Sequence, residues 1–381
     1  MSYNIKAAKI ILEDKILENN SVTTENSLIR AIGETAGNGE VLDLGSMTLV
    51  PGFIDMHIHG GNTYDTMDMS YNSLNELSLF KSKEGVTSFC PTIITTSLEK
   101  IINTIIEVKN AKSRGVDGAK ILGSFLEGPY LNVQYKGAHP KEWIRNIKLH
   151  ELEELVAAGD GSICSFAIAP ELSGADEAIA YLTKQNINVR IGHSAATCEQ
   201  ANHAVDLGAS IGIHTYNAMS PFTHRSPGMV GAILTNDTIY GEIICDFVHV
   251  DPKAIHVLLK CKGYDKVILV TDCMMAGGLS DGEYTLGELP VVVVNGECRL
   301  HSGVLAGSTL TIIKAISNLV HHMNIPLFNA VQMATINPAK ALNADRHIGS
   351  IKVGKQADLV GLDENLNIRF VMVDGKIIHH R

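Results

Sequence analysis

The chain has 381 residues, a formal net charge of −10 and 45% hydrophobic residues. This length is too great for one small bundle or sandwich, whereas one large α/β barrel with an accessory domain would fit it. The acidic balance argues against nucleic acid or an anionic membrane surface as the main partner, and no uninterrupted apolar run is long enough to span a membrane.

Both ends of the chain have the pattern of short strands. Residues 3–14, 26–33 and 41–50 are apolar runs separated by polar turns, and residues 357–380 repeat the pattern with Asp374-Gly375 as a hairpin turn. We therefore predict a small β-sandwich domain that is built from residues 1–50 and 349–381.

The middle of the chain, residues 51–348, alternates between strands and helices. Amphipathic helical stretches at 73–85, 97–115 and 198–208 separate apolar runs that suit parallel strands buried on both faces. Two later helices are expected at 308–323 and 326–342. The sequence therefore predicts an α/β fold, a (β/α)8 TIM-like barrel, with strands within residues 50–59, 86–94, 119–129, 162–171, 187–194, 209–217, 239–249 and 266–274.

The first predicted barrel strand ends in an unusual way. It reads "PGFIDMHIHGG" over residues 51–61, so that an apolar run leads into His57 and His59 and then into two glycines. Side chains two residues apart on a strand point to the same face. The two imidazoles are therefore expected to point at one ion.

Polar residues also end several of the other predicted strands. In a barrel of this type the carboxyl ends of the strands meet at one mouth. A single histidine there is more often a hydrogen-bonded core residue, but four histidines and a glutamate together indicate a metal site, because imidazole suits zinc, iron, nickel or copper and a carboxylate can bridge two ions. The residues are His57, His59, Glu127, His193 and His214, with Asp272 at the end of the eighth strand.

Seven motifs resemble the amidohydrolase superfamily and, within it, the N-acetylglucosamine-6-phosphate deacetylases. They span most of the chain, and the His-x-His pair is shared by the whole superfamily, whereas "HTYNAMSPFTHR" is the most specific to the deacetylases. The motifs are "PGFIDMHIHGG", "LEGPY", "KGAHP", "GHSAAT", "HTYNAMSPFTHRSPGMVGA", "VTDCM" and "LAGSTLT".

This resemblance implies a metal-dependent barrel with one or two divalent ions per subunit, either zinc, iron, manganese or cobalt. His57 and His59 would bind one ion, and His193 and His214 the other, with Glu127 shared between them. The sequence does not decide which metal is used, or whether one or two ions are bound.

The resemblance also implies roles for the remaining site residues. Asp272 would act first as general base and then as general acid. Arg225 would reach the substrate of the neighbouring subunit, which implies a homodimer. The residues expected to hold the sugar phosphate are His139, Asn217, Ala218 through its backbone, Arg225 and His249.

The reaction implied is hydrolysis of N-acetylglucosamine 6-phosphate to glucosamine 6-phosphate and acetate, in amino-sugar catabolism and cell-wall sugar recycling. Three positions depart from the family pattern, namely Ser226, Phe247 and Cys273. They leave the chemistry intact, although Phe247 could narrow the sugar pocket. The choice between glucosamine and galactosamine epimers stays open.

The cysteines favour a reducing compartment. They are odd in number and scattered, and no two form a Cys-x-x-Cys pair, so we expect free thiols and a cytoplasmic protein. The start of the chain has no apolar core of the kind found in signal peptides. The seven are Cys90, Cys164, Cys198, Cys245, Cys261, Cys273 and Cys298.

Three alternatives remain open at this level. The first is a deacetylase for another N-acetylhexosamine 6-phosphate, such as N-acetylgalactosamine 6-phosphate. The second is a different amidohydrolase, a cyclic amidase or a deaminase, although these commonly use a carboxylated lysine where this chain has Glu127. The third is a barrel without metals that serves as an assembly scaffold, although such proteins usually lose the ligands that are all present here.

Overall fold

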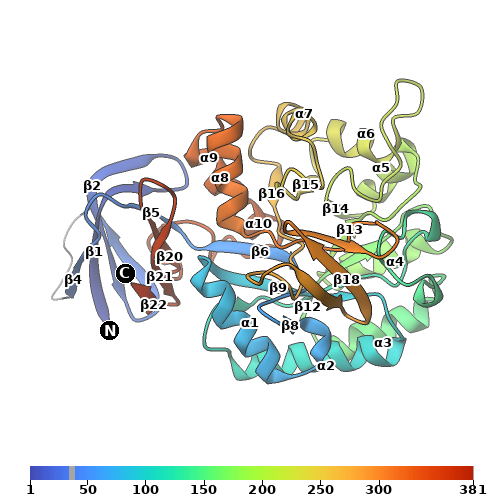
Figure 1. Ribbon diagram of the computed structural model, residues 1–381, viewed down its shortest axis with the longest axis horizontal. Coiled ribbons are helices and arrows are strands. Elements are labelled where there is room, and N and C mark those ends of the chain that lie inside the picture. The colour runs from blue at the N-terminus through green and yellow to red at the C-terminus, as the bar shows by residue number, and fades with distance from the viewer. Residues whose placement is uncertain (34–38, 381) are drawn as a thin grey trace.

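The computed structural model describes residues 1–33 and 39–380 and consists of a barrel with a β-sheet at one side (Figure 1). The barrel sheet is parallel throughout, and the eight predicted strands are confirmed, the third being split by a short β10 (Lys120–Ile121). The strands are β6 (Phe53–Ile58), β9 (Val86–Ile94), β11 (Ser124–Glu127), β12 (Ile163–Ile168), β13 (Asn188–Ile191), β14 (Ala209–Gly212), β15 (Tyr240–Ile243) and β16 (Val267–Leu269).

The barrel closes between its first and eighth strands, just beyond the end of β16. A parallel bridge joins Ile58 to Cys273, and the backbone N–H of Asp272 donates to the carbonyl of His57 over 2.9 Å. Closure therefore brings residues 57 and 272 side by side, although 215 positions separate them in the sequence (272 minus 57).

Helices cover the outside of the barrel, and an amphipathic helix there buries its apolar stripe against the strands. In α2, for example, the Ser97 hydroxyl accepts from the backbone N–H of Lys100 at the first turn, and Ile101, Ile105 and Val108 are buried. The helices are α1 (Tyr71–Lys83), α2 (Leu98–Arg114), α3 (Leu149–Gly159), α4 (Ala175–Lys184), α5 (Cys198–Asp206), α6 (Gly228–Thr235), α7 (Pro252–Lys262), α8 (Ile312–Met323), α9 (Leu327–Met333) and α10 (Ile336–Ala341).

The prediction of a single helix over residues 326–342 is wrong, because the structure has two helices there, α9 and α10, with a break between them. At the break, the carbonyl of Ala334 accepts a hydrogen bond from the backbone N–H of Ile54 in β6 over 2.8 Å. Pro338 lies in the first turn of α10, where its missing N–H costs no helical bond. The break thus lets the helix end bind a barrel strand.

The strands from the two termini pair with one another in the order β22-β21-β20-β5-β1-β2-β3, with β4 beside β1, which is consistent with the predicted β-sandwich domain built from both ends of the chain. Asp374 and Gly375 have φ angles of 51° and 75°, as the predicted hairpin turn requires. The domain limits at residues 50 and 349 stay a prediction. The strands are β1 (Ser2–Ile11), β2 (Ile16–Glu25), β3 (Leu28–Ile32), β4 (Glu40–Asp43), β5 (Thr48–Pro51), β20 (Leu359–Leu362), β21 (Ile368–Val373) and β22 (Lys376–His380).

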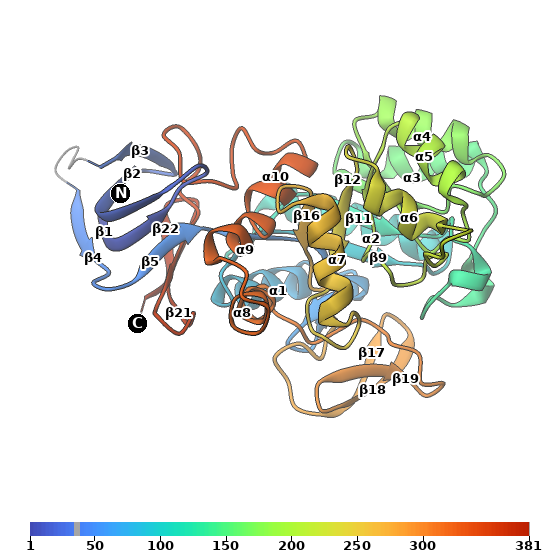
Figure 2. The same ribbon diagram turned by 90° about the horizontal axis from the view of Figure 1, so that it is seen from above.

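A three-stranded antiparallel sheet is inserted between β16 and α8, and the sequence analysis missed it. It comprises β17 (Gly282–Leu286), β18 (Leu289–Val294) and β19 (Glu297–Leu300), and it stands out from the body of the barrel in Figure 2. The N–H of Gly287 donates to Asp65 over 3.0 Å, so the sheet is tied to the loop after β6. This loop contains β7 (Gly60–Gly61), β8 (Tyr64–Asp65) and the 3-10 turn η1 (Thr66–Asp68).

Two further 3-10 turns, η2 (Val133–Tyr135) and η3 (Lys141–Trp143), lie between β11 and α3. Within residues 1–33 and 39–380, no helix has both the length and the apolar character needed to cross a bilayer.

Barrel closure can be tested at Thr271, whose hydroxyl donates to the buried carboxylate of Asp55 over 2.6 Å. We expect Thr271→Val to lower the free energy of unfolding by about 1–3 kcal/mol, because it removes the hydroxyl donor from that carboxylate and leaves only the longer bond from the backbone N–H of residue 271, at 3.3 Å. Urea unfolding followed by circular dichroism measures the loss. The control is Thr235→Val, whose hydroxyl bonds only to a carbonyl of its own helix; equal midpoints for the two variants would contradict the role of Thr271.

Candidate active site

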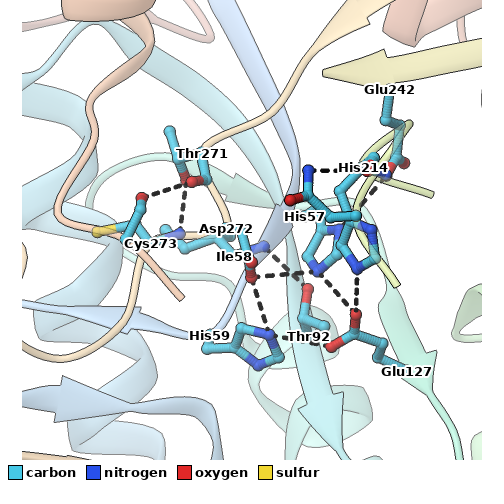
Figure 3. Close-up of polar contacts among 12 residues, drawn as sticks. His57, Ile58, His59, Thr92, Glu127, His214, Glu242, Thr271, Asp272 and Cys273 are labelled. Carbon is cyan, nitrogen blue, oxygen red and sulfur yellow. Dashed lines mark hydrogen bonds and ion pairs between the residues drawn. The ribbon is translucent and has the colours of Figure 1, made fainter. Parts of the chain in front are cut away.

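The centre of the site is the carboxylate of Glu127, the last residue of β11. Oε1 lies 3.2 Å from Nε2 of His193 and 3.3 Å from Nε2 of His214, and Oε2 lies 3.2 Å from Nε2 of His59. Figure 3 shows part of this arrangement. All the imidazoles that approach the carboxylate do so within 3.5 Å, and they belong to His57, His59, His139, His193 and His214.

The strands place these side chains as the spacing predicts. His57 lies in β6 and His59 directly follows it, with ring centroids 5.6 Å apart. The backbone N–H of Ile58 between them donates to the Thr92 hydroxyl of β9 over 2.9 Å (Figure 3). The two histidines therefore share one face, toward Glu127.

Two candidate metal ligands and Asp272 have a backbone conformation that residues other than glycine rarely adopt. The φ angles of His193, His214 and Asp272 are 47°, 27° and 50°. Such strain costs of order 1–3 kcal/mol per residue and persists where the surrounding structure imposes it. Each residue comes just after a barrel strand, so the turn directs its side chain into the mouth.

Two of the histidines are oriented by a second hydrogen bond. Nδ1 of His193 lies 2.8 Å from the carbonyl of Tyr135, and Nδ1 of His57 lies 3.3 Å from the Glu242 carboxylate. Because both partners are acceptors, each Nδ1 carries the proton. Nε2 of both rings lies on the side of Glu127 and carries no proton, so it is free to bind a metal ion there.

Glu242 belongs to a buried ion pair that the sequence analysis did not recognise. Its carboxylate is 2.5 Å from Nη1 of Arg190, whose other terminal nitrogen donates to the carbonyl of Met56 over 2.9 Å. The guanidinium also stacks on Phe125 at 3.8 Å. The signal was available, since both charges interrupt apolar barrel strands and need a partner when they are buried.

Asp272 lies beside the two histidines at the end of the first strand. Its Oδ1 lies 3.2 Å from Nε2 of His59 and 3.4 Å from Nε2 of His57. Burial alone would raise the pKa of Asp272, but the neighbouring His57 and His59 lower it to about 2. Asp272 is therefore a carboxylate at neutral pH and is available as a base.

The donor set fits a divalent cation. Nε2 of His57 is buried and has no hydrogen-bond partner among the described residues. Ligand atoms about 2.0–2.1 Å from a tetrahedral zinc ion lie roughly 3.3 Å apart, and Nε2 of His193 and Nε2 of His214 are 3.1 Å apart. Two groups have ligand atoms within 4.8 Å of one another: His57, His59 and Glu127, and Glu127, His139 and His193.

His139, which was expected to hold the substrate, also lies among the candidate metal ligands. Its Nε2 lies 3.5 Å from Glu127, and its ring lies 4.6 Å from that of His193. The second group of candidate ligands contains His139, whereas the sequence analysis placed His214 there. All three of these histidines line the same pocket.

The pocket has a volume of about 320 Å³ and contains most of the residues expected to hold a substrate. His139, Asn217, Ala218 and His249 line it, and Nδ1 of His249 lies 2.6 Å from Asp246. Arg225 is not among the lining residues that the structure describes and is exposed in the loop before α6.

The same end of the molecule contains an arginine that the sequence analysis did not single out. Arg299 of β19 lines the pocket together with Leu286 and Leu305. Its strand belongs to the unpredicted insertion, so sequence spacing gave no reason to place it beside the barrel mouth.

Known proteins resemble this chain over nearly its whole length. The model of the Amidohydrolase family matches residues 48–378. An N-acetylglucosamine-6-phosphate deacetylase of Vibrio furnissii is 40% identical over 375 residues, which are 97% of this chain and 94% of that protein. An N-acetylgalactosamine-6-phosphate deacetylase of Escherichia coli O157:H7 is 38% identical over 377 residues, which are 99% of each chain.

A solved structure has the same fold and a bound sugar phosphate. It is a mutant of the N-acetyl-D-glucosamine-6-phosphate deacetylase of Mycobacterium smegmatis in complex with N-acetyl-D-glucosamine-6-phosphate. Its TM-score to this chain is 0.94 at 31% identity, with 99% of each chain covered.

The orienting role of Glu242 can be tested by Glu242→Gln. We expect zinc affinity to fall about 10- to 100-fold, because the amide no longer fixes the His57 proton on Nδ1. Competition with a chromophoric chelator measures the affinity. Glu151→Gln is the control, since it breaks another glutamate–arginine ion pair outside the site, with Arg145, whose side chain is 33% exposed where Arg190 is fully buried. Equal affinity in all three proteins would show that Glu242 serves only as the counter-ion of Arg190.

Proposed function

This chain belongs to the amidohydrolase family, and we propose that it hydrolyses N-acetylglucosamine 6-phosphate to glucosamine 6-phosphate and acetate. The observation that carries this proposal is the Glu127 carboxylate surrounded by imidazoles, with Asp272 3.2 Å from His59 in the same pocket. Relatives with this activity in their names match nearly the whole chain.

We infer that one or two divalent ions serve as cofactor. An amide is a poor electrophile and water is a poor nucleophile; a bound divalent ion lowers the pKa of its water from about 15.7 toward about 7 and polarises the carbonyl. Glu127, His193 and His214 would hold one ion, and His57 and His59 with Glu127 a second. Zinc, iron, manganese and cobalt all suit these ligands.

Asp272 moves the proton in this proposal. As a carboxylate it accepts a proton from the attacking water, and as a carboxylic acid it then delivers that proton to the leaving nitrogen. Without this delivery the leaving group would be an amine anion. The two adjacent imidazoles of His57 and His59 fix the position of Asp272.

We propose that the sugar phosphate is held by His139, Asn217, the backbone of Ala218, and His249, all of which line the pocket. Arg225 is exposed outside that pocket, and in the proposed homodimer it reaches the site of the neighbouring subunit. We also place the reaction in the cytoplasm, which suits the seven free cysteines.

A second candidate substrate is N-acetylgalactosamine 6-phosphate, because the E. coli relative with that name is 38% identical over 377 residues. The two sugars differ only in the configuration at one carbon. An acetate-release assay with both N-acetylhexosamine 6-phosphates and their unphosphorylated forms ranks the substrates. No acetate release from any phosphorylated sugar would refute the proposed function.

The role of Asp272 predicts the behaviour of Asp272→Asn. The variant should bind metal and substrate normally but lose about 10²- to 10⁴-fold in kcat, because the amide cannot take the proton of the water. Metal analysis and substrate binding by calorimetry verify that the site is intact. A kcat near that of the wild type would remove Asp272 from the mechanism.

The role of Arg225 predicts a change that depends on the phosphate. Arg225→Ala should raise KM for the phosphorylated sugar and leave the unphosphorylated sugar unaffected, because a guanidinium binds phosphate through a planar fork of donors. His224→Ala, on the same exposed loop, is the control. Equal changes with both sugars would exclude phosphate recognition.

Coexpressed Arg225→Ala and Asp272→Asn chains test whether Arg225 acts across the dimer. Random pairing gives each mixed dimer one complete site, so at substrate concentrations well below KM about a quarter of the wild-type rate should return. Activity no higher than that of the separate variants would place Arg225 in its own subunit.

A further inference from the structure

The pocket contains a cation from its own subunit. Among the described lining residues, Arg299 is the one arginine or lysine. The carboxylates of Glu127 and Asp272 line the same space, and the whole chain has a net charge of −10. An anionic substrate must therefore meet a local positive charge before it can enter.

Arg299 has donors to spare. Its Nε and Nη2 donate to Oε2 of Glu297 over 3.1 and 2.8 Å, and its Nη1 donates to the carbonyl of Gly303 over 2.9 Å. A guanidinium has five N–H groups, so two of them have no acceptor within the described part of the chain. The side chain is 43% exposed, which leaves it open to a ligand.

Backbone hydrogen bonds connect the segment around Arg299 to Asp272. Arg299 forms an antiparallel bridge with Leu305, and three residues further on the N–H of Ser308 donates to the carbonyl of Asp272 over 2.8 Å. The backbone of Arg299 is therefore connected through a short hydrogen-bonded segment to Asp272, the residue proposed as the catalytic base.

Arg299 also lies within electrostatic reach of His249. Burial lowers the pKa of His249, Asp246 and Asp272 raise it above its ordinary value, and the guanidinium of Arg299 opposes that rise. His249 and Arg299 thus line the same pocket, each beside a carboxylate of its own, Asp246 for His249 and Glu297 for Arg299.

We propose that Arg299 binds the phosphate group of the substrate within its own subunit. This inference rests on the proposed function for the identity of the phosphate carrier. Arg225 lies outside the pocket in the single chain, so the two arginines would approach the phosphate from different subunits. Each subunit then retains part of its preference for phosphorylated sugars when Arg225 is removed.

The kinetic test compares Arg299→Ala and Arg299→Lys with a matched control. Arg369→Ala suits this purpose, because Arg369 is 41% exposed and also binds one carboxylate oxygen, that of Asp363, through Nε and Nη2. Arg299→Ala should raise KM for N-acetylglucosamine 6-phosphate about 10- to 100-fold and leave N-acetylglucosamine unchanged. Arg299→Lys should recover part of the loss, since it keeps the charge without the fork.

An Arg225→Ala background separates the two arginines, and Arg299→Ala should still raise KM there. Equal effects on the two sugars, or no effect beyond that of Arg369→Ala, would overturn the role of Arg299.

Binding of inorganic phosphate, followed by calorimetry on the metal-loaded protein, tests Arg299 independently of turnover. Affinity should fall about tenfold or more in Arg299→Ala and stay unchanged in Arg369→Ala. If the wild type releases no acetate but phosphate binding still depends on Arg299, the proposed function fails and the anion site stands. If acetate is released and neither KM nor phosphate affinity depends on Arg299, the anion site fails alone.

Discussion

The architecture depends on one buried carboxylate, that of Glu127, which five imidazoles approach within 3.5 Å. A charge in the interior requires partners of opposite sign or a bound cation. Burial raises the pKa of Glu127, but the surrounding histidines, first His57 and then His139, hold it well below its usual range. The carboxylate therefore stays ionised and can attract a metal ion. Barrel closure, the strained turns and the Arg190–Glu242 pair all bring ligands to this point.

Much of this arrangement could be predicted from the sequence because parallel barrels have strict rules. Buried strands appear as apolar runs, and their carboxyl ends share one mouth, so His57, His59, Glu127, His193, His214 and Asp272 could be brought together without coordinates. The Asp374-Gly375 turn was equally clear. Each of these predictions rests on a local pattern that the fold repeats.

What sequence reasoning missed depends on distant contacts. The bond from Ile54 to the carbonyl of Ala334 that accompanies the break between α9 and α10 cannot be read from the helix itself. The insertion at β17–β19 packs on the barrel mouth through long-range contacts, so neither its position nor the approach of Arg299 to the pocket followed from spacing. Arg190 and Glu242 were visible as charges in apolar strands, but their pairing requires the barrel to be closed.

In the proposed function, the residues for chemistry and those for recognition come from different parts of the fold. The candidate ligands and Asp272 come from barrel strands or the turns directly after them, whereas Arg225 and Arg299 come from a loop and from an inserted sheet. Loops on a rigid scaffold commonly set specificity. Preference for one amino-sugar epimer would accordingly depend on the residues outside the strands, while the hydrolytic centre remains the same.

The most direct test of the central claim is anomalous X-ray diffraction from crystals of the zinc-loaded protein, measured on both sides of the zinc absorption edge. We expect a strong peak within about 2.0–2.2 Å of a Glu127 oxygen and of Nε2 of His193 or His214. A loaded crystal in which zinc lies elsewhere, while these side chains bind one another directly, would contradict it.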